Sequence, residues 1–491
     1  MQQAFNNTLM RNASLSENSE LFDSLLSGSR EHYSIPAAAF TNYNVKRGLR
    51  NPDGTGVMAG ITKIGNAHGY IINEGDKIAI EGELYYRGYN VADLIRGYTE
   101  EGRFGFEETS YLLFFGDLPT KKQLADFDTL LDSYRYLPPR FTDDVIMRAP
   151  TQSLMNKIAT SVLALYAYDE NPDETSLENM LRQSMQLLAR LPIIAAQTYA
   201  FNRSYFHGES LNIHNPQNGL STAENFLRIM RPDCSYTDAE AKLLDLCLVL
   251  HAEHGGGNNS AFTCRVVSSS GTDSYAAIAS AINSLKGPKH GGANIKVTEM
   301  FDAIKHGVKN WEDDGEVTAF LERIMRGEEG DHSGLIYGMG HAIYTLSDPR
   351  AVMLKKYAKE LAKGTDFEPE FALLESVERL SPAVYAKIKK LDKNICANVD
   401  LYSGLVYRML GIPEELYTPL FAIARIAGWC AHRIEEVTTG KKIIRPAYKA
   451  IAKPREYAPL SVRGSDNCSC KKSARRADFC IRRELFRRAA V

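Results

Sequence analysis

Apolar residues at helical spacing, bounded by residues that cap helices, recur through the second half of the chain. In one such segment Thr237 stands three residues before Glu240, so each side chain can bind a free backbone N–H of the first helical turn. The run Leu243–Leu250 that follows is apolar except for Asp245, which predicts a helix that is buried on nearly all sides. We expect this helix to end at the glycines after His254, since glycine adopts the backbone conformation of a helix end.

Four further segments carry the same pattern. Their expected bounds are about 274–286, 348–364, from the end of NVDLYSG at residue 404 to the GIP at 411–413, and about 414–437. In the second of these, Asp348 suits the N-cap and Pro349 suits the first helical position. Residues 56–90 instead alternate apolar and polar residues around glycines, which predicts short strands and turns. The chain is therefore expected to be mainly α.

Length, charge and cysteine usage exclude several classes of protein. At 491 residues the chain exceeds one small core, so two domains are expected. The formal net charge of −2 gives no indication of a nucleic-acid partner. No stretch approaches the roughly 20 apolar residues that span a membrane. The polar, acid-containing N-terminus lacks the pattern of a secretory signal or presequence, and the eight cysteines show no metal-ligand spacing, which favours free thiols and a cytoplasmic location.

The segment HAEHGGGNN, residues 251–259, is the first candidate for chemistry. Its glycines could supply the oxyanion N–H groups of an α/β-hydrolase, but no serine lies in the G-x-S-x-G elbow that this fold requires. His251 and His254 could bind a metal from one face of a helix, but Glu253 is misplaced for the H-E-x-x-H motif. Two interpretations stay open here: a histidine pair that only ends a buried helix, or an imidazole that binds a substrate.

Two further histidines have the same kind of setting. His290 lies in GPKHGGAN, and His341 lies in GMGHAIYTLSDPRA. The glycines beside each histidine let backbone approach a ligand closely. This repetition favours substrate binding over a purely structural role.

The chain resembles the citrate synthase family in five segments that occur in this order: LHAEHGGGN, GPKHGGAN, GMGHAIYTLSDPR, NVDLYSG and AIARIAGW. The resemblance extends over about residues 58–460, and five such segments in order are far more specific than any one of them. It implies a mainly α, citrate-synthase-like two-domain helical fold with short N-terminal β segments. It also implies that a CoA thioester, usually acetyl-CoA, condenses with a 2-oxo acid, usually oxaloacetate, and that the resulting acyl-CoA is hydrolysed.

The resemblance implies roles for seven residues. Asp400 would be the general base that removes the α-proton of the thioester. His290 would donate a hydrogen bond to the thioester oxygen as the enol develops, and His341 would polarise the ketone and protonate the new alkoxide. The dicarboxylate would be held by His254, Arg350, Arg425 and Arg445, the last reaching in from the partner subunit of a homodimer.

General acid–base chemistry supports these residue types. Because a thioester α-proton is only weakly acidic, Asp400 needs a donor that stabilises the enolate, and loss of such a donor typically costs ~10²–10³ in rate. We expect His290 to begin a helix, whose positive end would keep its imidazole neutral. Arg350 could be a surface group in the first turn of its helix, but a cation there opposes the helix dipole, which argues for another purpose. Arg425 lies among apolar residues, where an unpaired charge would be costly, and guanidinium groups suit a carboxylate ligand. For Asp400 the structural alternative is the N-cap of the helix after it.

The resemblance also predicts how the chain is divided and assembled. The expected parts are an N-terminal arm, 1–40; a large helical domain, 41–289 with 397–460; a small domain that closes over CoA, 290–396; and a basic C-terminal tail, 461–491. The homodimer would act on small molecules, acetyl-CoA and oxaloacetate, with no metal or other cofactor, no nucleic acid and no membrane.

Two positions depart from the family pattern, and two other functions compete with the main one. Thr345 stands where many members carry Arg or Lys near the CoA phosphates, and Ile295 stands where a Glu often follows HGGAN. The nearest alternative is 2-methylcitrate synthase, which uses propionyl-CoA, because one methylene changes specificity by only ~1–3 kcal/mol. A non-catalytic CoA-binding or regulatory homologue is the alternative of another class, and the presence of His290, His341 and Asp400 argues against it.

Overall fold

The computed structural model describes residues 23, 26, 33–51, 54–390 and 394–463. The described parts of Met1–Arg47 and Arg445–Val491 form one compact unit, and Gly48–Ile444 form the other. Most residues of the expected arm, 1–40, and of the expected basic tail, 461–491, lie outside the described residues. The expected division of the remainder into a large and a small domain stays a prediction.

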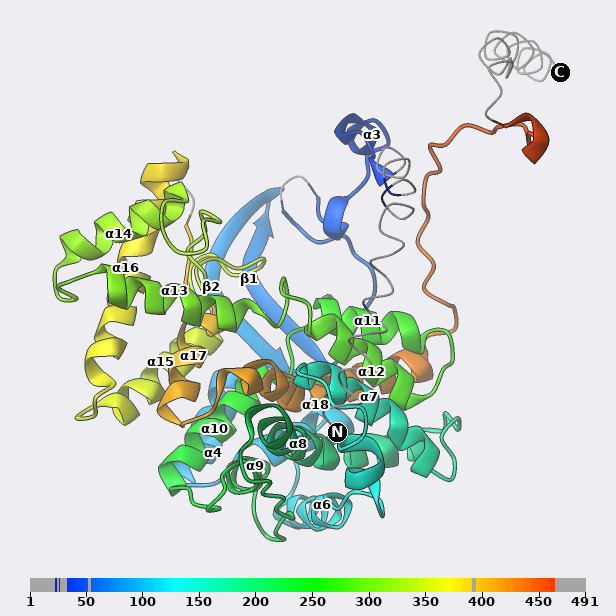
Figure 1. Ribbon diagram of the computed structural model, residues 1–491, viewed down its shortest axis with the longest axis vertical. Coiled ribbons are helices and arrows are strands. Elements are labelled where there is room, and N and C mark those ends of the chain that lie inside the picture. The colour runs from blue at the N-terminus through cyan, green and yellow to red at the C-terminus, as the bar shows by residue number, and fades with distance from the viewer. Residues whose placement is uncertain (1–22, 24–25, 27–32, 52–53, 391–393, 464–491) are drawn as a thin grey trace. The chain divides into compact units, whose positions relative to one another are not determined.

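Helices make up most of the described chain (Figure 1). They are α3 (Ala37–Asn42), α4 (Val91–Glu100), α5 (Phe106–Phe115), α6 (Lys121–Tyr134), α7 (Leu154–Ala164), α8 (Leu177–His207), α9 (Thr222–Met230), α10 (Asp238–His251), α11 (Asn259–Ser268), α12 (Ser274–Leu285), α13 (Ala293–Gly307), α14 (Asp314–Arg326), α15 (Pro349–Ala362), α16 (Glu368–Lys389), α17 (Val399–Met409) and α18 (Tyr417–Thr439). None of the described helices combines the length and apolarity needed to cross a membrane. The expected mainly α fold is confirmed.

One antiparallel sheet precedes the helices of the larger unit. It consists of β1 (Gly65–Asn73), β2 (Asp76–Tyr86) and β3 (Tyr89–Asn90), in the order β1-β2-β3. Glu74 and Gly75 join β1 to β2, and both have positive φ, at 53° and 94°, as a tight two-residue hairpin turn requires. The expected strands are present but two are not short, since β1 has 9 residues and β2 has 11.

Helix α18 forms the centre of the core. Between Tyr417 and Ile434 all of its residues are buried except Phe421, and it packs against α5, α8, α10, α11 and α12. Figure 1 shows α18 and α8 next to each other in the middle of the helical layer. A polar side chain on such a helix cannot reach bulk water, so its hydrogen-bonding groups need partners in the protein or in a ligand.

Helices α13 to α17 lie together on one side of the larger unit (Figure 1). Helix α17 packs against α13 and α15, and α15 also packs against α10. The first turns of α15 and α17 and the end of α10 are thereby brought into one region. This packing positions the glycine–histidine segments relative to one another.

Helix α10 ends earlier than the sequence predicts. Its capping box at Thr237 is present, but its last residue is His251, so His254 lies in the loop that follows. Arg425 Nε donates to His251 O (2.6 Å), and Gly428 N donates to Ala252 O (3.2 Å). Because α18 satisfies these carbonyls, the chain leaves the helix before the glycines are reached.

The starts of two helices, α17 and α13, also differ from the sequence prediction. The helix expected after NVDLYSG begins inside that segment, at Val399, because Asn398 acts as the N-cap and accepts the N–H of Asp400 (3.0 Å). The structural alternative for Asp400, that it only caps this helix, is therefore wrong. Helix α13 begins at Ala293, so His290 lies in the turn before the helix and does not begin it.

Candidate active site

A short backbone pairing brings the segments of His341 and Asp400 together. Gly340 N donates to Cys396 O (2.7 Å), and Asn398 Nδ2 donates to Gly340 O (2.9 Å). Asn398 also caps the helix that carries Asp400. The residue before His341 and the start of α17 are thus fixed by the same side chain.

The protonation state of His341 follows from its neighbours. Its Nδ1 accepts hydrogen bonds from the backbone N–H groups of Ile343 (3.1 Å) and Tyr344 (3.2 Å), so Nδ1 carries no proton. Burial, together with the charge of Arg350, lowers the pKa of His341 to about 4. At neutral pH the ring is therefore neutral, with its proton on Nε2 and available to a ligand.

His254 is a buried imidazole beside His341. The two ring centroids are 5.2 Å apart, and the His254 ring lies 5.7 Å from that of Tyr344. Burial, and then the charge of Arg350, hold the pKa of His254 well below its usual range. His254 Nε2 has no hydrogen-bond partner among the described residues, so the interpretation that it only ends a helix does not account for it.

Arg425 is a fully buried cation in the middle of α18, 0% exposed. Its Nε donates to His251 O, while Nη1 and Nη2 have no partner in the part of the chain that the structure describes. Burial lowers the pKa of Arg425 to about 10, so it stays protonated at neutral pH. A guanidinium with both outer nitrogens available matches a carboxylate through two hydrogen bonds, and without an anion its burial would be costly.

Arg350 differs from Arg425 in having an anionic partner. It lies at the start of α15, and its Nε and Nη2 bind Oδ1 (3.0 Å) and Oδ2 (2.7 Å) of Asp348. Burial alone would lower the pKa of Arg350, but Asp348 raises it above its usual value. The helix-dipole argument predicted that Arg350 is more than a surface group, and the structure shows it buried and bound to the N-cap residue Asp348.

Asp400 is a half-buried carboxyl in the first turn of α17. Burial raises its pKa to about 6, although the positive charges of Arg350 and Arg425 oppose this rise. The group is therefore mostly ionised at neutral pH yet more basic than an ordinary Asp. This combination suits a general base.

His290 lies in the turn between α12 and α13, near the buried face of α18. Its Nε2 is 3.0 Å from Ser260 Oγ, which also accepts a hydrogen bond from Trp429 Nε1 (3.0 Å). Burial and the charge of Arg425 lower the pKa of His290 to about 4. The imidazole is neutral as expected, but the cause is burial and a neighbouring cation, since no helix starts at this residue.

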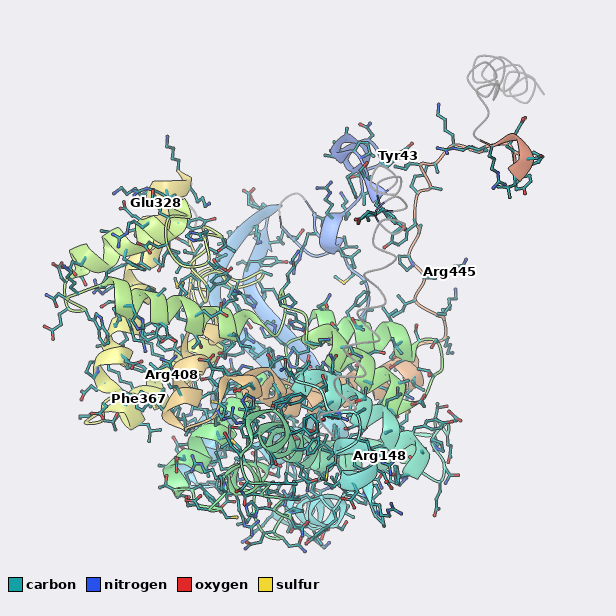
Figure 2. All side chains as sticks on the ribbon, viewed as in Figure 1. Tyr43, Arg148, Glu328, Phe367, Arg408 and Arg445 are labelled. Atoms are coloured by element: carbon teal, nitrogen blue, oxygen red, sulfur yellow. The ribbon has the colours of Figure 1, made fainter. Side chains whose placement is uncertain are left out.

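Six of the seven sequence-predicted residues lie in the larger unit, and each interacts electrostatically with at least one of the others. These six are His254, His290, His341, Arg350, Asp400 and Arg425. The seventh, Arg445, belongs to the other unit; its side chain is exposed on an extended segment (Figure 2). Its expected role in the site stays a prediction.

Several neighbours of the site were not found by sequence reasoning. Phe421 lies under the Arg425 guanidinium (4.8 Å) and beside His290 (6.1 Å between ring centroids). Its position one turn before Arg425 was a usable signal. Glu253 was noticed only as a mismatch to a metal motif, yet it is fully buried and bonded to His432.

A cavity of about 260 Å³ adjoins His341. Its lining includes Thr345, Tyr385 and the exposed cation Lys389. Thr345 Oγ1 is buried and has no hydrogen-bond partner among the residues described. Over the same residues, no three His, Cys, Asp or Glu side chains are grouped as metal ligands.

The geometry can be compared with known proteins. The family model "Citrate synthase, C-terminal domain" matches residues 54–447. The chain belongs to the citrate synthase family. A citrate synthase of Corynebacterium glutamicum is 35% identical over 378 residues, which cover 74% of this chain and 79% of the relative. The 2-methylcitrate synthase 2 of the same organism is 32% identical over 385 residues, or 77% and 92% of the two chains.

The fold agrees with the family. The citrate synthase of Thermoplasma acidophilum, solved as a ternary complex with carboxymethyl coenzyme A and oxaloacetate, aligns with a TM-score of 0.68 and 25% identity, covering 85% of this chain and 99% of that one. The family recognised from the sequence is confirmed, and the chain is an enzyme of the acyltransferase type typical of that family.

Proposed function

We propose that the chain is a citrate synthase that condenses acetyl-CoA with oxaloacetate and hydrolyses the product to citrate and CoA. The observation that carries this proposal is a buried pair of donors, Arg425 Nη and His254 Nε2, that have no partner among the described residues. A dicarboxylate with a ketone offers the acceptors that these donors lack. The Thermoplasma relative, solved with oxaloacetate and a CoA derivative, supports the same ligands for this chain.

The proposed reaction uses each group in the state that its surroundings favour. Asp400, with a pKa of about 6, takes a proton from the carbon beside the thioester carbonyl. The electron pair moves toward the thioester oxygen, where His290 donates a hydrogen bond. The enol carbon forms a bond to the ketone carbon of oxaloacetate, and the ketone oxygen takes the proton of His341. Water then cleaves the thioester and releases citrate and CoA.

Neutral histidines suit these roles. With pKa values of about 4 for His290 and His341, both rings hold one proton at neutral pH and can donate it without a prior charging step. Such donors, aimed at oxygen atoms where charge develops, are usually the largest single contribution to the rate acceleration of an enzyme. The Nε2–H of His341 is fixed by its backbone bonds, which supports its assignment as the alkoxide acid.

The cavity beside His341 supports a place for the CoA thioester. Thr345 cannot supply the cation that many family members carry at this position, and Lys389 contributes a positive charge to the same lining. We therefore infer that binding of the CoA phosphates depends on cations at positions other than 345. Replacement of Thr345 by Arg should strengthen acetyl-CoA binding.

2-Methylcitrate synthase is the second candidate. A relative of that name matches at nearly the same identity as one named citrate synthase, and both reactions need the same charges and donors. A non-catalytic homologue is disfavoured, because several ionisable groups with shifted pKa values that converge in one place are typical of active sites.

We also propose a homodimer in which Arg445 serves the partner subunit, and a cytoplasmic location. The resemblance to the citrate synthase family supports the shared arginine, since it implies this role for Arg445. A reducing compartment fits the five described cysteines, all of which are free thiols: Cys234, Cys247, Cys264, Cys396 and Cys430.

Release of CoA thiol tests the proposal. The full chain is given oxaloacetate with acetyl-CoA or with propionyl-CoA, and kcat/KM is measured for each. A citrate synthase should prefer acetyl-CoA, and the difference of one methylene typically gives roughly 10–200-fold discrimination. A preference for propionyl-CoA would support the second candidate, and no oxaloacetate-dependent thiol release from either would overturn both.

A further inference from the structure

Glu253 lies between the two histidines of the HAEHGGG segment and is enclosed by glycines. It is 0% exposed. A Cβ on Gly65 would lie 2.7 Å from Glu253 Cγ, and a Cβ on Gly428 would lie 2.3 Å from Glu253 Oε2. Only glycine at both positions leaves room for this carboxylate. A buried carboxylate is costly unless it is paired, so its partners indicate why it is there.

The first partner of Glu253 is His432, and Arg265 fixes the proton of that ring. Arg265 Nε and Nη2 lie 3.1 Å and 2.7 Å from His432 Nδ1. Arginine can only donate, so Nδ1 must accept and carries no proton. A neutral His432 then has its proton on Nε2, and donates it to Glu253 Oε1 (2.8 Å).

The second partner of Glu253 is the backbone beside His254. Glu253 Oε1 also accepts the N–H of Gly255 (2.5 Å), and Gly255 has a φ of +83° that favours glycine. The carboxylate thereby closes a tight turn with His254 at its centre. Its negative charge also acts on the buried cation Arg425.

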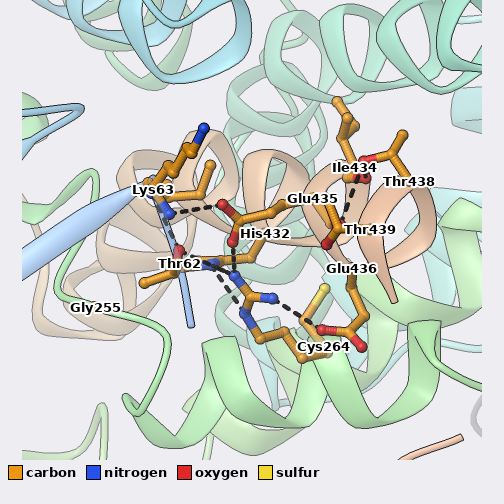
Figure 3. A network of polar contacts seen from close by, with 12 residues as sticks. Thr62, Lys63, Gly255, Cys264, His432, Ile434, Glu435, Glu436, Thr438 and Thr439 are labelled. Atoms are coloured by element: carbon orange, nitrogen blue, oxygen red, sulfur yellow. Dashed lines mark hydrogen bonds and ion pairs between the residues drawn. The ribbon is translucent and has the colours of Figure 1, made fainter. Parts of the chain in front are cut away.

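The outer end of this chain of contacts is anchored at several points. Arg265 binds Glu435, Glu436 (2.8 Å) and Thr62 Oγ1 (3.1 Å), and Glu435 Oε1 accepts the backbone N–H of Lys63 (2.7 Å) (Figure 3). These bonds use the whole guanidinium fork of Arg265. The guanidinium therefore has little freedom to turn away from His432.

We propose that Arg265, His432 and Glu253 form a positioning relay, which orients His254 and balances the charge of Arg425 for binding of the 2-oxo acid. This inference rests on the proposed function and deepens it. Glu253 does not contact the reacting atoms in this scheme. It acts through His254 and Arg425, so it is a positioning residue.

The relay predicts that a variant lacking the His432 donor loses more activity at low pH than the native protein does. The ionisable groups that face Glu253 are His432 and Arg425 on α18, Tyr86 at the end of β2, and Arg87 in the turn after it. Burial alone would raise the pKa of Glu253, but His432 and Arg425 hold it below its usual range. Without the His432 donor the pKa of Glu253 rises, so the carboxylate becomes protonated, and the relay fails, as pH falls.

The central test compares two replacements of His432. In His432→Gln the side-chain carbonyl can accept from Arg265 and the amide can donate to Glu253, so the relay is rebuilt. His432→Met fills similar space and can do neither. We expect kcat/KM for oxaloacetate to stay within about threefold of the native value in His432→Gln. In His432→Met it should fall by roughly 10–100-fold, which is the usual range for a lost hydrogen bond to a charged group, and the deficit should grow as the pH is lowered.

Arg433→Met is the matched control on the same helix. Arg433 is also buried, but it binds Ser274 Oγ (2.9 Å) and Thr272 O (2.8 Å), away from the 251–255 turn. Its loss should lower the melting temperature without changing the oxaloacetate KM or the pH profile. If His432→Met behaved like this control, or if His432→Gln lost as much activity as His432→Met, the relay would be refuted.

A double-variant cycle separates positioning from direct binding. If the relay acts in part through His254, His432→Met should cost clearly less when His254 is already Ala than it does in the native protein, because interacting residues are not additive. Fully additive losses would contradict the relay. If His432→Met does not fold, Glu253→Gln, which keeps the shape and removes the charge, replaces it. The loss in kcat/KM for oxaloacetate should be similar, but it should not grow as the pH falls, because no carboxylate is left to titrate.

Failure of the proposed function is distinguishable from failure of the relay. If native protein released no thiol with either acyl-CoA, the proposed function would fail. Nitrogen NMR of His432 would still decide whether its proton is on Nε2, as the relay requires. If native protein turned over and the variants showed no pH-dependent deficit, only the relay would be wrong.

Discussion

Arg350 and Arg425 are both buried cations, but the protein compensates them differently. Asp348 binds Arg350 through two hydrogen bonds, so that charge is neutralised within the protein. Arg425 has one protein acceptor, and its two outer nitrogens have none among the described residues. We infer that Arg425 is the principal carboxylate ligand, and that Arg350 contributes mainly by its field on Asp400 and the histidines.

Replacement of Asp400 by Asn tests the base assignment. Asn keeps the size of the side chain and cannot take the α-proton, so kcat should fall by at least the ~10²-fold typical of general-base catalysis. Oxaloacetate binding, measured by calorimetry, should stay near the native value. Normal binding together with near-normal turnover would refute the role of Asp400.

Replacement of His254 by Ala tests whether this histidine of the HAEHGGGNN segment binds the 2-oxo acid. Loss of a buried donor to a charged ligand should raise the KM for oxaloacetate by about tenfold or more, and turnover should also fall if the contact tightens in the transition state. Chelators should leave native activity unchanged. Activity that is lost on metal removal and restored by zinc would support the metal interpretation instead.

At the scale of elements, the close packing of α18 against the 251–255 turn determines the shape of that turn. A Cβ at Gly428 would meet Glu253 Oε2 at 2.3 Å and Ala252 O at 2.5 Å. Gly428→Ala should therefore displace the 251–255 turn, lower the melting temperature and raise the oxaloacetate KM. Gly97→Ala on α4 is the control, because nothing lies within 4 Å of its Cβ position, and it should stabilise the protein by up to ~1 kcal/mol. Equal effects of the two changes would contradict this account.

Local signals predicted a helix boundary well where the residues that decide it are near neighbours in the sequence. The capping box at Thr237 and the Asp348–Pro349 pair mark true helix starts, because capping is an interaction between near neighbours. The end of α10 at His251 depends on hydrogen bonds from α18, more than 170 residues later. No pattern near His251 contains that information, so the helix was predicted to be too long.

At the scale of the whole molecule, features of the site that depend on near neighbours in the sequence could be predicted, and features that depend on distant residues could not. Glycine–histidine segments could be found in the sequence because each carries its own pattern, and the resemblance then supplied Asp400 and the arginines. The partner of Glu253 could not be found in this way, since His432 is 179 residues away. The reason why His290 is neutral was also missed, because burial and the approach of Arg425 are properties of the packed structure.

Complementation between inactive subunits tests the proposed dimer. One chain carries Arg445→Ala and the other carries Asp400→Asn, and each is expected to be nearly inactive alone. In a mixed dimer one composite site would have both Asp400 and Arg445 intact. With random exchange half of the dimers are mixed and each has one working site of two, so about a quarter of native activity should return.

The two variants are refolded together, and mass measurement confirms mixed dimers. If Arg445 serves its own subunit, no combination of the two chains gives a complete site. Absence of recovered activity in confirmed mixed dimers would therefore rule out a shared site.

The pH dependence of kcat/KM for acetyl-CoA, at saturating oxaloacetate, tests the central claim most directly. The pKa of Asp400 is about 6, whereas those of His290 and His341 are about 4. Since the base must be ionised, activity should be constant from about pH 7 to 8 and fall toward tenfold per pH unit below 6. This acid limb should be absent from the residual activity of Asp400→Asn. A native profile that stays flat down to pH 5, or a limb that persists in Asp400→Asn, would contradict the account.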